Sequence, residues 1–103
     1  MAELNVTKAN FEQEAVNSEK TVLLDFCATW GGPCRMIAPA VAAVAEENPH
    51  VLVGKVNVDE EPDLARAFGI TSIPTLVVMK DGKEVRRAVG VQTKEQILKL
   101  VKG

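Results

Sequence analysis

The chain has 103 residues, 47% of them hydrophobic, and its 12 basic residues against 14 acidic ones leave a net charge of −2. This length predicts one domain, residues 1–103, with enough apolar side chains for a packed core. The near-neutral charge argues against a nucleic-acid or acidic-membrane binder, since both depend on a strong basic field. We expect a soluble monomer.

The N-terminal residues lack the basic and apolar regions of a secretory signal, and no apolar run approaches the roughly 20 residues of a membrane helix. We therefore expect a cytoplasmic protein. In a reducing compartment, a cysteine pair is more often catalytic or metal-binding than structural. One histidine and two cysteines argue against a zinc site, and neither a metal nor another cofactor is expected.

The first half of the chain alternates strand and helix patterns. Alternation around residues 4–6 indicates a first strand, and Asn10 with Gln13 predicts a capping box before a short helix from about Phe11 to Asn17. The run Thr21–Phe26 is nearly all apolar, which is typical of a strand covered on both faces.

The second half continues this alternation. Helix and strand patterns follow at residues 34–48 (helix, interrupted by Pro39), 51–59 (strand), 63–68 (helix), 76–79 and 84–89 (strands) and from 93 onward (helix). Asp81-Gly82 predicts a hairpin turn, and Thr93 with Gln96 predicts a second capping box. The order βαβαβαββα predicts an α/β fold with a central mixed five-stranded sheet flanked by four helices.

Three residues stand out inside this framework. Asp25 lies in a strand that should be buried, so it is either a solvated edge residue or a buried acid with a raised pKa and a proton-transfer role. Lys55 is likewise either a solvated edge lysine or the partner of Asp25. Cys34 follows Gly-Gly-Pro at a predicted helix start, where unpaired N–H groups favour a thiolate.

Several motifs recur in the order and spacing of a known family: Asp25-Phe26, Ala28, Trp30, Gly32-Pro33-Cys34, Met36 to Pro39, Lys55 to Asp59, Gly69-Ile70, Ile73 to Thr75, Gly82 and Val89-Gly90. With these motifs the chain resembles the thioredoxin family over essentially its whole length. The resemblance implies the thioredoxin fold, disulfide-containing client proteins and a thioredoxin reductase as electron donor.

The resemblance also implies roles for individual residues. Asp25 would be the buried acid, paired with Lys55, and Pro74 would be cis beside the sulfurs, although trans is the statistical default for an X–Pro bond. A groove for extended peptide substrates would be bordered by Trp30, Gly31, Gly32, Pro33, Ile73, Pro74 and Gly90.

The chain departs from the family in the motif itself. The family pattern is Trp-Cys-Gly-Pro-Cys, but here Gly31 stands at the position of the exposed nucleophile. Where the family usually has a tryptophan before Ala28, this chain has Cys27. The attacking sulfur is missing from its usual place, and a cysteine has appeared seven residues ahead of Cys34.

Two main hypotheses follow. Cys27 and Cys34 could form a relocated redox pair (CX6C, with a Cys27–Cys34 disulfide), making the chain a protein-disulfide reductase or electron carrier with Asp25 moving protons. Alternatively, Cys27 is an inert buried residue, and the chain is a redox-inactive or single-thiol peptide-binding module whose Cys34 forms only mixed disulfides. A laboratory substitution is a third explanation. Which sulfur attacks stays open in the first hypothesis.

Overall fold

We describe the protein from a computed structural model, which places residues 3–103. The elements follow the predicted order: β1 (Glu3–Asn5), η1 (Glu12–Val16), β2 (Thr21–Cys27), α1 (Gly32–Glu47), β3 (Val51–Asn57), α2 (Pro62–Ala67), β4 (Thr75–Lys80), β5 (Lys83–Val89) and α3 (Lys94–Lys102). Within residues 3–103, no helix combines the length and apolarity needed to cross a membrane.

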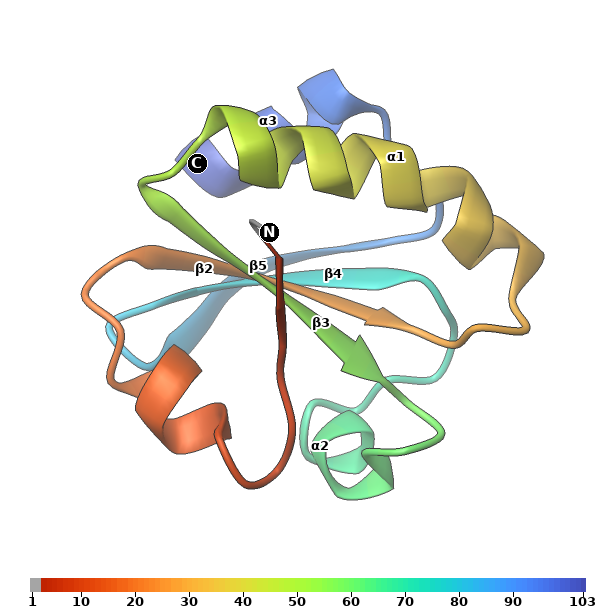
Figure 1. Ribbon diagram of the computed structural model, residues 1–103, viewed down its shortest axis with the longest axis horizontal. Coiled ribbons are helices and arrows are strands. Elements are labelled where there is room, and N and C mark those ends of the chain that lie inside the picture. Colours follow the sequence, from red (N-terminus) through yellow and green to blue (C-terminus); the bar gives the residue numbers. More distant parts are fainter. Residues whose placement is uncertain (1–2) are drawn as a thin grey trace.

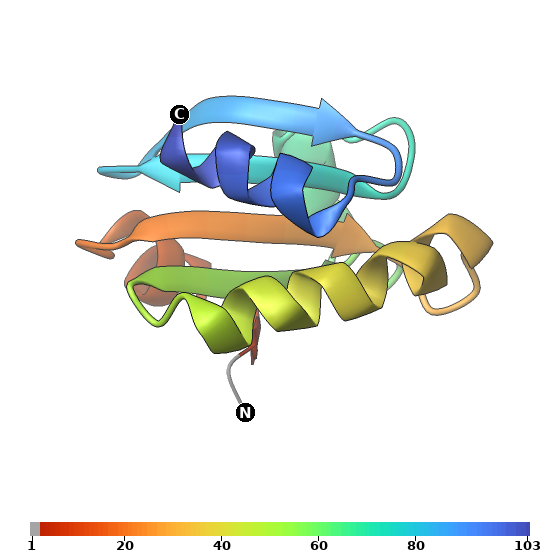
Figure 2. The same cartoon turned by 90° about the horizontal axis from the view of Figure 1, so that it is seen from above.

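The strands form one mixed sheet in the order β1-β3-β2-β4-β5. β3 runs parallel to β1 and β2, whereas β4 is antiparallel to β2 and β5. α1 and α3 cover one face of the sheet and η1 and α2 the other (Figure 1). Figure 2 shows α1 and α3 side by side over their face. The thioredoxin fold expected from the sequence is confirmed.

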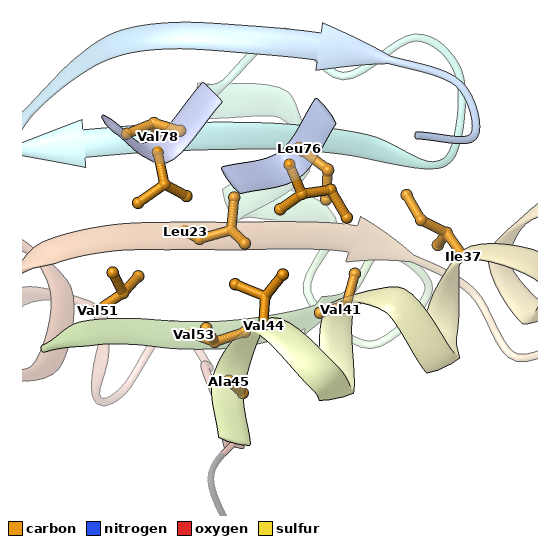
Figure 3. Packing of buried hydrophobic residues seen from close by; sticks show 11 residues of the cluster. Leu23, Ile37, Val41, Val44, Ala45, Val51, Val53, Leu76 and Val78 are labelled. Atoms are coloured by element: carbon orange, nitrogen blue, oxygen red, sulfur yellow. The ribbon is translucent and has the colours of Figure 1, made fainter. Parts of the chain in front are cut away.

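The central strand β2 is apolar because both of its faces are covered. Leu23 packs in one buried cluster with Val41 and Val44 of α1, which point toward the sheet in Figure 3. Leu24 and Phe26 belong to the cluster on the opposite face. Since side chains alternate along a strand, Asp25 and Cys27 share the face of Leu23, beneath α1. This alternation positions the site.

The two predicted capping boxes have different outcomes. Thr93 and Gln96 form theirs reciprocally, with Thr93 Oγ1 accepting from the Gln96 N–H at 3.1 Å and Gln96 Oε1 accepting from the Thr93 N–H at 2.8 Å. The prediction of a capping box at Asn10 and Gln13 is wrong. Asn10 Oδ1 instead accepts from the Thr7 N–H at 2.8 Å in the preceding turn, and η1 is a π-helix without a side-chain cap.

The close approach of β1 to β3 generates a prediction. A Cβ on Gly54 would lie 2.5 Å from Val6 Cγ2 and 3.1 Å from Leu24 Cδ2. We expect Gly54→Ala to lower the free energy of unfolding by about 1–3 kcal/mol through overpacking. Urea denaturation at constant pH measures this loss.

Two further variants test the cause of that loss. The double variant Val6→Ala/Gly54→Ala should lose less stability than the sum of its single variants, because the missing methyl groups leave room for the new one. Gly32→Ala is the matched control, since its nearest neighbour is Arg35 Nη2 at 4.0 Å, and it should cause no loss. Strictly additive losses would contradict the clash.

Candidate active site

The connection from β2 to α1 is a tight turn over residues 28–31. The Gly31 N–H donates to the Ala28 carbonyl at 3.2 Å, and the Gly31 carbonyl accepts from the Arg35 N–H at 3.1 Å as α1 begins. Pro33 fits the first turn because it needs no N–H partner there. Cys34 therefore lies in the first turn of a 16-residue helix, as predicted, where the free N–H groups and the helix dipole favour a thiolate.

The two cysteines meet across this turn. The structure joins Cys27 and Cys34 by a disulfide, with their Cα atoms 5.7 Å apart, and the described residues hold no free cysteine. Cys27 is the last residue of β2 and is half-buried, whereas Cys34 is only 6% exposed. Cys27 is thus the more accessible of the two residues.

Asp25 lies two residues before Cys27 on the same face of β2. It is 1% exposed, and its Oδ1 has no hydrogen-bond partner among the described residues. Burial raises the pKa of Asp25 from 3.8 to about 6, and Lys55 lowers it while Glu3 raises it further. The solvated-edge interpretation of Asp25 is therefore wrong, and the residue is a buried acid.

Lys55 is the cross-strand neighbour of Asp25 in the parallel β2–β3 ladder. It is half-buried, and its positive charge lowers the pKa of Asp25. No hydrogen bond or ion pair within 4.0 Å joins the two side chains in the part of the chain that the structure describes. Lys55 acts on Asp25 through its field rather than through contact.

The groove residues that the resemblance implies come together only in part. Pro74 is buried and follows a cis peptide bond, and its carbonyl accepts from the Gly90 N–H at 2.8 Å. A Cβ on Gly31 would lie 3.4 Å from both Cys34 Sγ and Ile73 Cδ1, so Gly31 borders the same region. Because residue 31 is a glycine, it contributes no sulfur to this region.

Trp30, a further residue of the expected groove, forms its side-chain hydrogen bond with a residue that follows β3. Trp30 is 66% exposed, and its Nε1 donates to Asp59 Oδ2 at 2.6 Å, beyond the end of β3. Asp59 is itself oriented by Asn57, whose Oδ1 accepts from the Asp59 N–H at 2.9 Å. Sequence reasoning missed both as site residues. Their signal was their place at the last residue of β3 (Asn57) and two residues beyond it (Asp59), where the carboxyl end of β3 lies beside that of β2.

A pocket of about 470 Å³ opens at the carboxyl ends of β1, β2 and β3, against the first turns of α1. It is lined by both cysteines, by Asp25 and Lys55, and by Asn5, Val6, Thr7, Ala28, Thr29, Arg35, Ala38, Val56, Asn57, Glu60 and Glu61. Trp30, Ile73, Pro74 and Gly90 are not among its lining residues. The lining of the pocket thus differs from the groove expected from the resemblance, and the pocket was not predicted.

Comparison with known proteins agrees with this geometry. The Thioredoxin family model matches residues 2–103. Thioredoxin of Alicyclobacillus acidocaldarius is 48% identical over 97 residues, which cover 93% of this chain and 91% of the relative. Thioredoxin of Chlamydia trachomatis is 44% identical over 96 residues, covering 93% and 92%.

A solved structure shows the same fold. A mutant thioredoxin from Halobacterium salinarum superposes with a TM-score of 0.89 at 36% identity, covering 97% of this chain and 88% of that one. The sequence, the fold and the cysteine-bearing turn thus lead to one assignment: this chain belongs to the thioredoxin family and is a thioredoxin-like oxidoreductase.

Proposed function

We propose that the chain performs dithiol–disulfide exchange with Cys27 and Cys34 as its redox pair, in place of two cysteines within the family motif. The observation that carries the proposal is the 5.7 Å separation of their Cα atoms, which lies in the range that a disulfide requires. Reversible opening and closing of this bond transfers two electrons.

The two sulfurs have different roles in this proposal. Cys27 attacks the substrate disulfide and holds the mixed disulfide, because it is the more accessible residue. Cys34 then attacks Cys27 and releases the second substrate thiol. In the reverse direction Cys34 is the leaving group, and its place at a helix N-terminus suits that role because a stabilised thiolate leaves faster.

Asp25 is the proposed proton acceptor and donor for this exchange. It lines the same pocket as both cysteines, and a carboxyl group that titrates near pH 6 can take up a thiol proton and return it. Lys55 is a positioning residue whose positive charge keeps the pKa of Asp25 from being raised further. No cofactor takes part in the exchange.

The remaining roles follow family membership. We propose disulfide-containing clients, a thioredoxin reductase as electron donor, and the cytoplasm as compartment. Trp30, Gly31, Gly32, Pro33, Ile73, Pro74 and Gly90 are the proposed substrate-binding residues. One observation favours the single-thiol alternative: at Gly31 the groove has no sulfur where the family has its nucleophile.

Thiol counting separates the proposal from that alternative. The oxidised wild type should contain no free thiol, and Cys27→Ser and Cys34→Ser should each contain one. Cys34→Ser should accumulate a mixed disulfide at Cys27, because the resolving sulfur is absent, and both variants should lose catalytic turnover with a disulfide substrate. Alkylation under denaturing conditions followed by mass spectrometry gives the counts.

Two outcomes would contradict the redox pair. One is an oxidised wild type that still shows two free thiols. The other is a Cys27→Ser variant whose turnover equals that of the wild type, since Cys27 would then be a packing residue only.

The buried acid gives a pH prediction. The unfolded carboxyl ionises near 3.8 and the folded one near 6, so the folded state holds more protons between these values and loses stability as pH rises through them. The whole shift corresponds to up to about 3 kcal/mol. Asp25→Asn should therefore gain stability relative to wild type between pH 4 and pH 7, as measured by urea denaturation at each pH.

Asp81→Asn is the control for the loss of one carboxylate, because Asp81 is exposed in the hairpin turn and lies outside the pocket. Its stability relative to wild type should not change over the same pH range. A constant difference between Asp25→Asn and wild type from pH 4 to pH 7 would show that the acid is not perturbed.

A further inference from the structure

The disulfide can be approached from two sides, and only one side exposes a reactive sulfur. On the groove side, Gly31 has no side chain, and Cys34 behind it is 6% exposed. On the pocket side, Cys27 is half-buried and lines the cavity directly. A small substrate can reach Cys27 through the pocket, whose lining does not include Ile73, Pro74 or Gly90.

The size of the pocket limits that substrate. Its volume of about 470 Å³ falls within the roughly 300–1,000 Å³ typical of small-molecule sites. It lies between three strand ends and the first turns of α1, whose wall includes the small residue Ala38. A disulfide in a folded protein would have to bring its flanking chain between the sheet and this helix.

The lining carries charges of both signs. Lys55 and Arg35 are cationic, whereas Asp25, Glu60 and Glu61 are acidic. Arg35 and Glu61 already have partners, because Arg35 Nη1 donates to the Thr29 carbonyl at 3.1 Å and Glu61 Oε1 accepts from the Lys8 N–H at 2.8 Å. An apolar or singly charged ligand would still leave Lys55, or Asp25 and Glu60, without an opposite charge on the ligand. A small molecule with both ammonium and carboxylate groups complements them, because each group then has an opposite charge within the same cavity.

We propose that the pocket admits small disulfides of the amino-acid type, of which cystine is the simplest, and that these exchange with Cys27 in preference to protein disulfides. This inference rests on the proposed function, because it requires a redox-active Cys27–Cys34 pair. It adds the substrate class and the route by which the substrate reaches the sulfur.

The reaction balances without another reagent when the protein starts reduced. The Cys27 thiolate attacks one sulfur of the small disulfide, forming a mixed disulfide and releasing one thiolate, which takes up a proton. The Cys34 thiolate then attacks Cys27, forming the Cys27–Cys34 bond and releasing the second thiolate. The small disulfide gains two electrons and becomes two thiols, and the protein dithiol is oxidised.

Single-turnover kinetics test the preference. Reduced wild type, freed of reductant, is mixed with cystine or with insulin, and acid-quenched samples are counted for protein thiols. We expect cystine to oxidise the protein at least about tenfold faster per disulfide, because the pocket positions it at Cys27. An equal or faster reaction with insulin would overturn the inference and leave the proposed function intact.

A pocket-filling variant tests the route. Ala38→Leu places a larger side chain in the cavity without changing either cysteine, and should slow oxidation by cystine by about tenfold or more. Ala42→Leu, one turn further along α1 and outside the lining, is the matched control. Unchanged cystine kinetics in folded Ala38→Leu would overturn the inference.

A gain-of-function variant gives an independent readout. At Gly31, the position of a new Cβ lies 3.5 Å from Cys34 Cβ, at the short end of the range for a disulfide. Gly31→Cys should therefore restore a sulfur on the groove side and raise the insulin rate relative to the cystine rate. An unchanged ratio would count against the two-route interpretation. Failure of the redox pair itself appears separately, as two free thiols in the oxidised wild type.

Discussion

The site depends on one packing constraint, the fixed placement of the first turn of α1 beside the carboxyl end of β2. Leu23 of β2 is buried in one cluster with Ile37 and Val41 of α1, so the strand and the helix cannot move apart without opening the core. The short turn between them then leaves Cys27 and Cys34 with Cα atoms 5.7 Å apart. Apolar contacts that take no part in the proposed chemistry thus hold the two cysteines together.

Burial at the same place makes Asp25 an unfavourable residue for the folded state. Asp25 is only 1% exposed, its Oδ1 lacks a partner among the described residues, and Lys55 on the neighbouring strand makes no ion pair with it. An asparagine or an apolar residue would be easier to accommodate at neutral pH. An acid whose pKa of about 6 lies close to physiological pH is useful beside two sulfurs, which offers a functional reason for tolerating that burden.

The sequence predicted most of this arrangement because hydrophobic periodicity records which faces are buried. The apolar run of β2, the first turn of α1 and the reciprocal cap at Thr93 all follow from local patterns. The cap at Asn10 did not, because the same amide can accept from a turn N–H as readily as from a helix N–H. The sequence also suggested that Lys55 pairs with Asp25, and the structure makes them cross-strand neighbours without an ion pair. Strand register fixes only the neighbouring backbones, whereas the long lysine side chain is flexible.

The pocket could not be predicted from the sequence, because a cavity depends on how several elements pack together and on the space that their side chains leave unfilled. Cys27 stands where the resemblance places a tryptophan, and a sulfur fills far less space than an indole. The same exchange therefore removes bulk beside α1 and puts a sulfur at the edge of the resulting space, while Gly31 removes the sulfur on the groove side. In the proposed exchange, moving the sulfur from position 31 to position 27 therefore changes which molecules can reach it.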